Sequence, residues 1–286
     1  MPALRTAVRK FRILAVAGLI GVLSAAPSHL SAQAPLDQAW AILQAGAENK
    51  SADQQVVTMR VLQLIPGNAN AASLAEKALQ DKDTEVRGAA ALSLGAMGEK
   101  SAIPQLKEVI KNDKEGSVAL AAAKALIQLG DDHGYEVYYA VISGTRKSGE
   151  GLVGDQTKEL SELVSNPKAM EKMAFEQGMG FVPFGGISLQ VYQRIHDSKA
   201  KAPLLKATSI KVLAKDPDPR SEKLIVTALS DKAWLIRAAA YDALARRGDA
   251  AVLPDLSPGL KDEKVEVKLT AAAAIVHLSA ISKDVQ

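Results

Sequence analysis

One pattern of apolar and polar residues recurs as a unit along the chain. An Asp stands five residues before a branched apolar residue, an alanine-rich stretch follows, and the better copies then reach a Gly. Within one copy, Val86, Ala90, Leu94 and Met97 recur at the spacing of one α-helical face. The four clearest pairs are Asp81 with Val86, Asp113 with Val118, Asp231 with Ile236, and Asp262 with Val267. The pattern predicts amphipathic helices, each entered from an Asp-containing turn.

The spacing of these units predicts a stack of helical hairpins. The first two anchors are 32 residues apart and the last two 31, with weaker copies at 53–67 and 203–216. Leucine-rich stretches at 101–110 and 251–260 predict a short first helix in each unit, with Pro104 and Pro254 near its opening turn. Gly98, Gly130 and Gly248 are typical of left-handed helix ends. A repeat of about 30 residues with this content indicates a helical solenoid.

The pattern D-x-x-x-x-V-R-x-A-A-A, with L-G-D at the unit end, resembles the HEAT-like repeats first named for phycobilisome lyases. The resemblance covers about residues 50–143 and 203–282. It implies an all-α, right-handed helical-hairpin solenoid with a degenerate or inserted helical segment in the middle. Similar repeats occur in scaffolds, bilin lyases, DNA glycosylases and an iron hydroxylase, so the resemblance predicts the fold and not an activity.

The middle of the chain, residues 144–202, departs from the repeat. It contains a glycine-rich stretch at 144–154, two amphipathic stretches and the segment GMGFVPFGGIS at 178–188. Departures from a solenoid repeat often carry binding function. The candidate partner-binding residues are Phe181, Val182, Pro183, Phe184, Arg146 and Lys147. The apolar ones form either the core of a connection or an exposed patch for a partner or lipid.

The first 34 residues are typical of a signal peptide. Four basic residues precede an apolar run at 13–26, and Ala32 and Ala34 give the small-x-small pattern of a cleavage site. The run is too short for an ordinary membrane span, although an uncleaved anchor is the alternative. We expect cleavage after Ala34, a periplasmic or secreted protein without a stable membrane span, and repeats at 35–143 and 203–286.

Charge and chemistry then exclude several classes of function. The signal holds four of the 35 basic groups and none of the 32 acidic groups, which leaves the mature chain with a net charge of −1. That charge disfavours nucleic-acid binding. There is no Cys, no helical His pair and no coherent catalytic cluster, so we expect no metal, no cofactor and no catalytic residue. Gly149, Gly151 and Gly154 lack the strand that a dinucleotide site needs.

The last predicted helix, at 267–282, is apolar on most sides. A terminal repeat ordinarily has a polar outer face, so either the stack curls to cover this helix or another chain associates with it. The sequence therefore predicts a non-catalytic, exported scaffold that binds an unknown protein partner. The alternative is a small-ligand enzyme or accessory subunit resembling bilin lyases, which the export signal and the lack of a catalytic cluster disfavour.

Overall fold

A computed structural model describes residues 29–143 and 198–284 of the chain, and all regular structure in these ranges is helical. The N-terminal arm comprises α1 (His29–Ala47), α2 (Ala52–Leu62), α3 (Ala69–Ala78), α4 (Thr84–Met97), η1 (Lys100–Ala102), α5 (Ile103–Asn112), α6 (Gly116–Gln128) and α7 (His133–Ser143). The C-terminal arm comprises α11 (Ser198–Leu213), α12 (Pro219–Ala228), α13 (Trp234–Arg247), η2 (Ala250–Val252), α14 (Leu253–Leu256), η3 (Ser257–Lys261) and α15 (Val265–Asp284).

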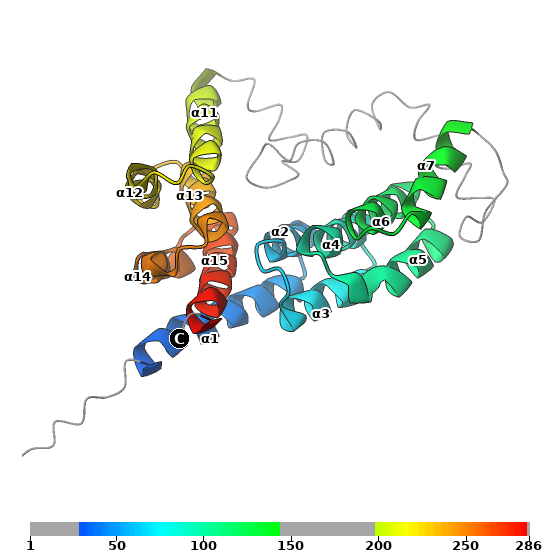
Figure 1. Cartoon of the computed structure of the whole chain (residues 1–286), viewed down its shortest axis with the longest axis horizontal. Helices are drawn as coiled ribbons and strands as arrows, with labels where there is room; N and C mark the ends of the chain where they lie inside the picture. The colour runs from blue at the N-terminus through cyan, green and yellow to red at the C-terminus, as the bar shows by residue number, and fades with distance from the viewer. Residues whose placement is uncertain (1–28, 144–197, 285–286) are drawn as a thin grey trace, which may run out of the picture.

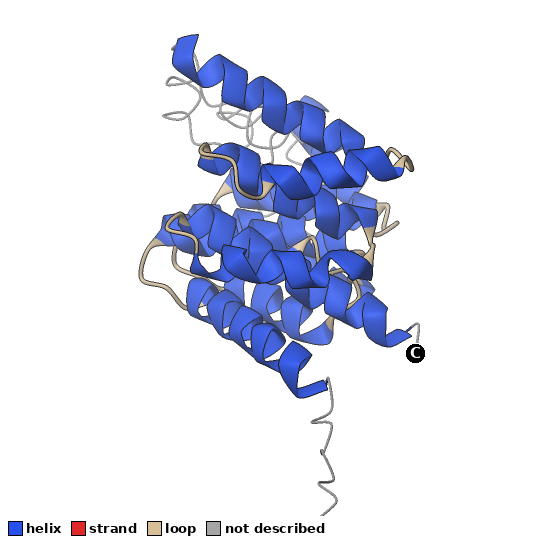
Figure 2. Ribbon diagram, turned by 90° about the vertical axis from the view of Figure 1, so that its left-hand side faces the viewer, coloured by secondary structure: helices blue, strands red, loops and turns tan. Residues whose placement is uncertain are grey.

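The helices stack in layers, which confirms the predicted solenoid (Figure 2). Second helices of successive units pack on one another, as α2, α4 and α6 do in one arm and α11, α13 and α15 in the other. The first helices α3, α5, α12 and α14 lie on the outer side, and the second helices line the angle between the arms (Figure 1). We call the surface of the second helices that faces this angle the inner side.

The two arms meet through the ends of the chain, because α15 packs against α1 and α2 (Figure 1). The spatial order of units therefore begins at α11, passes through α15 to α1, and ends at α7. The first and last described helices, α1 and α15, lie near the middle of the stack, whereas α7 and α11 form the two ends of its described part. The C-terminal repeat is thus an interior repeat of the assembled stack.

This order explains the apolar character of the last helix. Residues Ala271–Ala274 of α15 are fully buried, and α1, α2 and α13 pack around the helix. Of the two alternatives that the sequence left open, the structure shows the first, because other helices of the stack cover this one. Within the described ranges, Val265–Lys283 is the one helix long and apolar enough to cross a membrane, and a core helix passes the same test.

Turns and helix ends agree with the sequence pattern. Gly98, Gly130 and Gly248 adopt left-handed conformations, with φ of 74°, 83° and 75°. Pro104 and Pro254 stand in opening turns. The aspartates of the turns accept a backbone N–H two residues on, as Asp81 does from Asp83 at 2.8 Å. These aspartates thus satisfy backbone donors of the turns by local hydrogen bonding.

The stretch 251–260 differs from the single short helix that was expected. It forms one α-helical turn, Leu253–Leu256, between two 3₁₀ segments. Pro258 removes a backbone donor at the start of the second segment. Gly259 then packs against the ring of Tyr241, where a Cβ would overlap the phenol. Burial is also the main reason why the pKa of Tyr241 rises to about 12.

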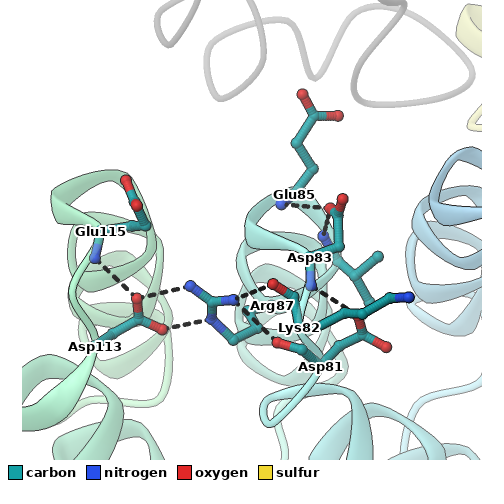
Figure 3. A network of polar contacts seen from close by, with 8 residues as sticks. Asp81, Lys82, Asp83, Glu85, Arg87, Asp113 and Glu115 are labelled. Atoms are coloured by element: carbon teal, nitrogen blue, oxygen red, sulfur yellow. Dashed lines mark hydrogen bonds and ion pairs between the residues drawn. The ribbon is translucent and has the colours of Figure 1, made fainter.

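An Arg-to-Asp ladder joins neighbouring units. Arg87 of α4 reaches Asp113 of the next unit through two hydrogen bonds, 2.6 Å from Nε and 2.9 Å from Nη2 (Figure 3). Its Nη1 also donates to the carbonyl of Asp81 at 2.9 Å. Arg237 repeats this geometry toward Asp262, at 2.7 and 2.8 Å. Two other units use a different donor at the same place: Gln55 on Asp81 and Lys206 on Asp231.

Acid should weaken this ladder. In the ladder, the pKa of Asp231 is lowered chiefly by the hydrogen bond from Lys206, and outside the ladder that of Asp131 is lowered by the hydrogen bond from Lys107. A carboxylate with a lowered folded-state pKa stabilises the fold above its unfolded pKa, here 3.8, and the contribution disappears as pH falls through the folded value. We expect the free energy of unfolding in urea to fall below about pH 4, and Asp231→Asn to reduce that dependence. Unchanged stability down to pH 2 would contradict the prediction.

Helix α11 begins at Ser198, five residues before the predicted start of the C-terminal repeats at 203, and Pro203 lies inside the helix. At the N-terminus, helix α1 contains Pro35, and the first residues with described packing are Leu36 and Ala39. Both residues follow the predicted cleavage site at Ala34.

Candidate functional site

The partner-binding residues predicted from the sequence, Arg146, Lys147, Phe181, Val182, Pro183 and Phe184, lie outside the described residues. The expected helices between 156 and 198 also lie there, apart from the start of α11. The described residues offer a different candidate, which is the inner side of the stack. The repeat itself provides a way to locate its residues.

Counting from the ladder residues identifies equivalent positions on the second helices. Asp242 follows the ladder residue Arg237 by five positions, and Arg246 follows it by nine. Asp242 stands two residues from both Ala240 and Leu244, which are fully buried, so it points to nearly the opposite side of α13. The equivalent pairs are Leu92 and Ala96 in α4, Ala273 and His277 in α15, Lys124 and Gln128 in α6, Arg60 and Leu64 at α2, and Lys211 and Lys215 at α11, where Leu64 and Lys215 lie in the turns just after their helices.

The C-terminal arm carries a compact group of charges at these positions, which we call the inner cluster: Lys211, Asp242 and Arg246. Arg246 donates from Nε to Asp242 Oδ2 at 2.9 Å and from Nη2 to Oδ1 at 3.2 Å. Lys211 Nζ lies 3.9 Å from the same carboxylate. That approach confirms that equivalent positions on α11 and α13 are neighbours in space.

Burial within the inner cluster is uneven. The side chain of Asp242 is 3% exposed, that of Lys211 19% and that of Arg246 46%. Burial lowers the pKa of the Lys211 ammonium, Asp242 opposes this shift and Arg246 adds to it. Two cations thus share one carboxylate, which leaves an excess positive charge beside a buried ammonium group.

The fold does not require charge at these positions. In α4 they hold Leu92 and Ala96, and in α15 the first of them holds Ala273, which is fully buried. An apolar residue therefore satisfies the packing of the same position elsewhere in the stack. Burying a charge carries a desolvation penalty that an apolar residue avoids. Because Leu92 and Ala273 occupy the same position without a charge, the buried Asp242 is not required by the repeat and marks a candidate site.

The inner cluster was missed in the sequence. The stretch WLIRAAAYDALARRGDA was recognised as a repeat, but Asp242 and Arg246 look there like an ordinary exposed pair four residues apart. The available signal was the contrast with Leu92 and Ala96 once the copies are aligned on their ladder residues. Arg247 next to the cluster has a different role, because it donates to the carbonyls of Leu213 and Asp216 in the turn after α11.

The described residues present no other obvious chemistry. Among residues 29–143 and 198–284, no group of three or more His, Asp or Glu side chains could hold a metal ion. His277 is partly buried on α15, and burial lowers its pKa. The inner cluster can bind and neutralise an anion, since its two cations exceed its one carboxylate.

Comparison with known proteins agrees with the repeat architecture. The family model for HEAT repeats matches residues 39–127 and 193–276. Among solved structures, the chain is similar to human deoxyhypusine hydroxylase in complex with glycerol, with a TM-score of 0.34 and 16% identity over 88% of this chain and 99% of that one. A likeness at this level carries no inference about activity. No curated protein sequence matches the chain.

Proposed function

The chain belongs to the HEAT-repeat family, and from this premise we propose that it is a non-catalytic, exported scaffold that binds a protein partner on its inner side. Stacked repeats of this kind create extended concave surfaces, which are their usual binding surfaces. The observation that supports this proposal is the inner cluster. Its charges occupy positions that other units fill with Leu92, Ala96 and Ala273.

Photo-crosslinking in intact cells tests the binding surface. A photoreactive residue replaces Ala96, which is exposed at an inner position, and in a control it replaces Lys77 of α3, whose side chain is 74% exposed. We expect a discrete adduct with another protein from Ala96 and none from Lys77. Equal labelling at both positions, or adducts only at Lys77, would refute the inner side as the binding surface.

The proposed export of the protein leads to a separate prediction. The basic and apolar pattern of residues 1–34 supports it, and cleavage after Ala34 leaves the packed residues from Leu36 onward in place. We expect the intact mass of the protein from the extracytoplasmic fraction to correspond to a chain beginning at Pro35. A full-length mass in the membrane fraction would instead indicate the uncleaved anchor.

A further inference from the structure

We propose that the inner cluster is the anchoring site for an acidic segment of the protein partner. A carboxylate of that segment pairs with Lys211 and Arg246 beside Asp242. The inference rests on the proposed function of the inner side as the binding surface, and it adds the chemistry of the partner.

The cluster is arranged to accept a second carboxylate. Arg246 uses Nε and Nη2 for Asp242, and its Nη1 makes no hydrogen bond to another described residue. Lys211 lies at ion-pair distance from Asp242, beyond hydrogen-bond range. An arriving carboxylate would therefore find donors on both cations without displacing Asp242. Charge-assisted bonds of this kind are strong and directional.

Asp242 also has a role in this arrangement. Two cations held together without a counter-charge would repel each other, and Lys211 is largely removed from solvent. The carboxylate of Asp242 holds both cations close together while the partner is absent. It neutralises only one of the two charges, so the site keeps its attraction for an anion.

The surroundings favour an extended polypeptide over a small ion. Lys215, four residues after Lys211 and in the turn that follows α11, is exposed at the position that counting makes equivalent to Arg246. The cationic positions thus continue along the inner side from α13 to α11, across neighbouring helices that pack together. Several carboxylates spaced along a peptide match this row, because complementary charges across an interface determine its specificity.

The test measures binding of fluorescein-labelled octaglutamate to the full chain by fluorescence anisotropy, at low and at physiological ionic strength. We expect salt-sensitive binding that Arg246→Gln weakens about fivefold. Arg220→Gln is the matched control. It makes the same change on α12, where Arg220 pairs with Asp218 and its side chain is 87% exposed, and it should leave the affinity unchanged within about twofold.

A second, triple variant distinguishes loss of the binding site from misfolding. Lys211→Leu, Asp242→Ala and Arg246→Ala together give the inner positions residues that α4 and α15 already use, so the fold is expected to persist. The net charge falls by one, as it does in the control. We expect the affinity for octaglutamate to fall at least about tenfold while the thermal midpoint changes little.

Several outcomes would overturn the inference. Octaglutamine binding as tightly as octaglutamate would show that charge is not recognised, and an equal loss in Arg220→Gln would show only a net-charge effect. Inorganic phosphate that binds alone with the same sensitivity to Arg246→Gln would make this a small-ion site. Tighter binding of a DNA duplex would point to nucleic acid. Crosslinking at Ala96 without octaglutamate binding would refute this inference and leave the proposed function intact.

Discussion

Replacing Arg237 by methionine should lower the free energy of unfolding by about 2–3 kcal/mol. The side chains of Arg237 and Asp262 are 13% and 11% exposed, and two hydrogen bonds of 2.7 and 2.8 Å join them across neighbouring units. Methionine keeps the apolar stem but leaves the Asp262 carboxylate without its partner. The guanidinium also donates to the carbonyl of Asp231 at 2.9 Å, so the same change removes an anchor of the preceding turn.

Arg237→Lys should recover only part of this loss, because a single ammonium group cannot reproduce the two-pronged contact. Lys77→Met is the control. Lys77 pairs with Glu48 at 3.3 Å, but the side chains are 74% and 51% exposed, so the loss should stay within about 0.5 kcal/mol. Urea unfolding of the full chain measures each variant. Equal losses at Arg237 and Lys77 would show that the ladder adds no more than a surface ion pair.

The repeats could be predicted from the sequence because their signals are local. An Asp in the turn, an apolar helical face at Val86 and Leu94 and a closing Gly98 all lie within one unit. Each describes hydrogen bonding or burial over a few residues, and the structure places each as expected. The ladder partner of Arg87 lies 26 positions away, in the next unit, and the regular repeat makes a contact at that separation predictable as well.

The junction of the arms could not be predicted in this way. Helix α1 packs on α15, so its partner lies at the other end of the chain and follows no period. The turn before α2 carries Asn49 where four other units have Asp, and Asn49 accepts from the N–H of Ser51 in the same manner, at 2.9 Å. The inner cluster was hidden for a related reason. An Asp and an Arg four residues apart look the same in the sequence whether the pair faces solvent or a neighbouring helix, so the spacing of Asp242 and Arg246 did not distinguish the two cases.

Gly46→Ala should destabilise the protein by about 1–3 kcal/mol, whereas Gly88→Ala should stabilise it by about 0.4–1 kcal/mol. Both glycines lie within helices. At Gly46, a Cβ would overlap Thr58 Oγ1 of α2 and lie 2.9 Å from Leu269 Cδ2 of α15. Thr58 and Leu269 are buried, so neither side chain can move aside freely. At Gly88, the nearest atom, Ala121 Cβ, is 4.0 Å away, so a methyl group fits without a clash. Alanine then stabilises the protein because it lowers the conformational entropy of the unfolded chain.

The opposite signs make this pair of variants a test of the junction itself. Helix propensity favours alanine over glycine in both helices, so propensity alone predicts two stabilised proteins. Close packing of α1 against α2 of its own arm and α15 of the other arm reverses the sign at Gly46. Stabilisation of both variants in urea unfolding would contradict this packing. A loss at Gly46 alone would support close packing of α1 against these two helices, where the two arms meet.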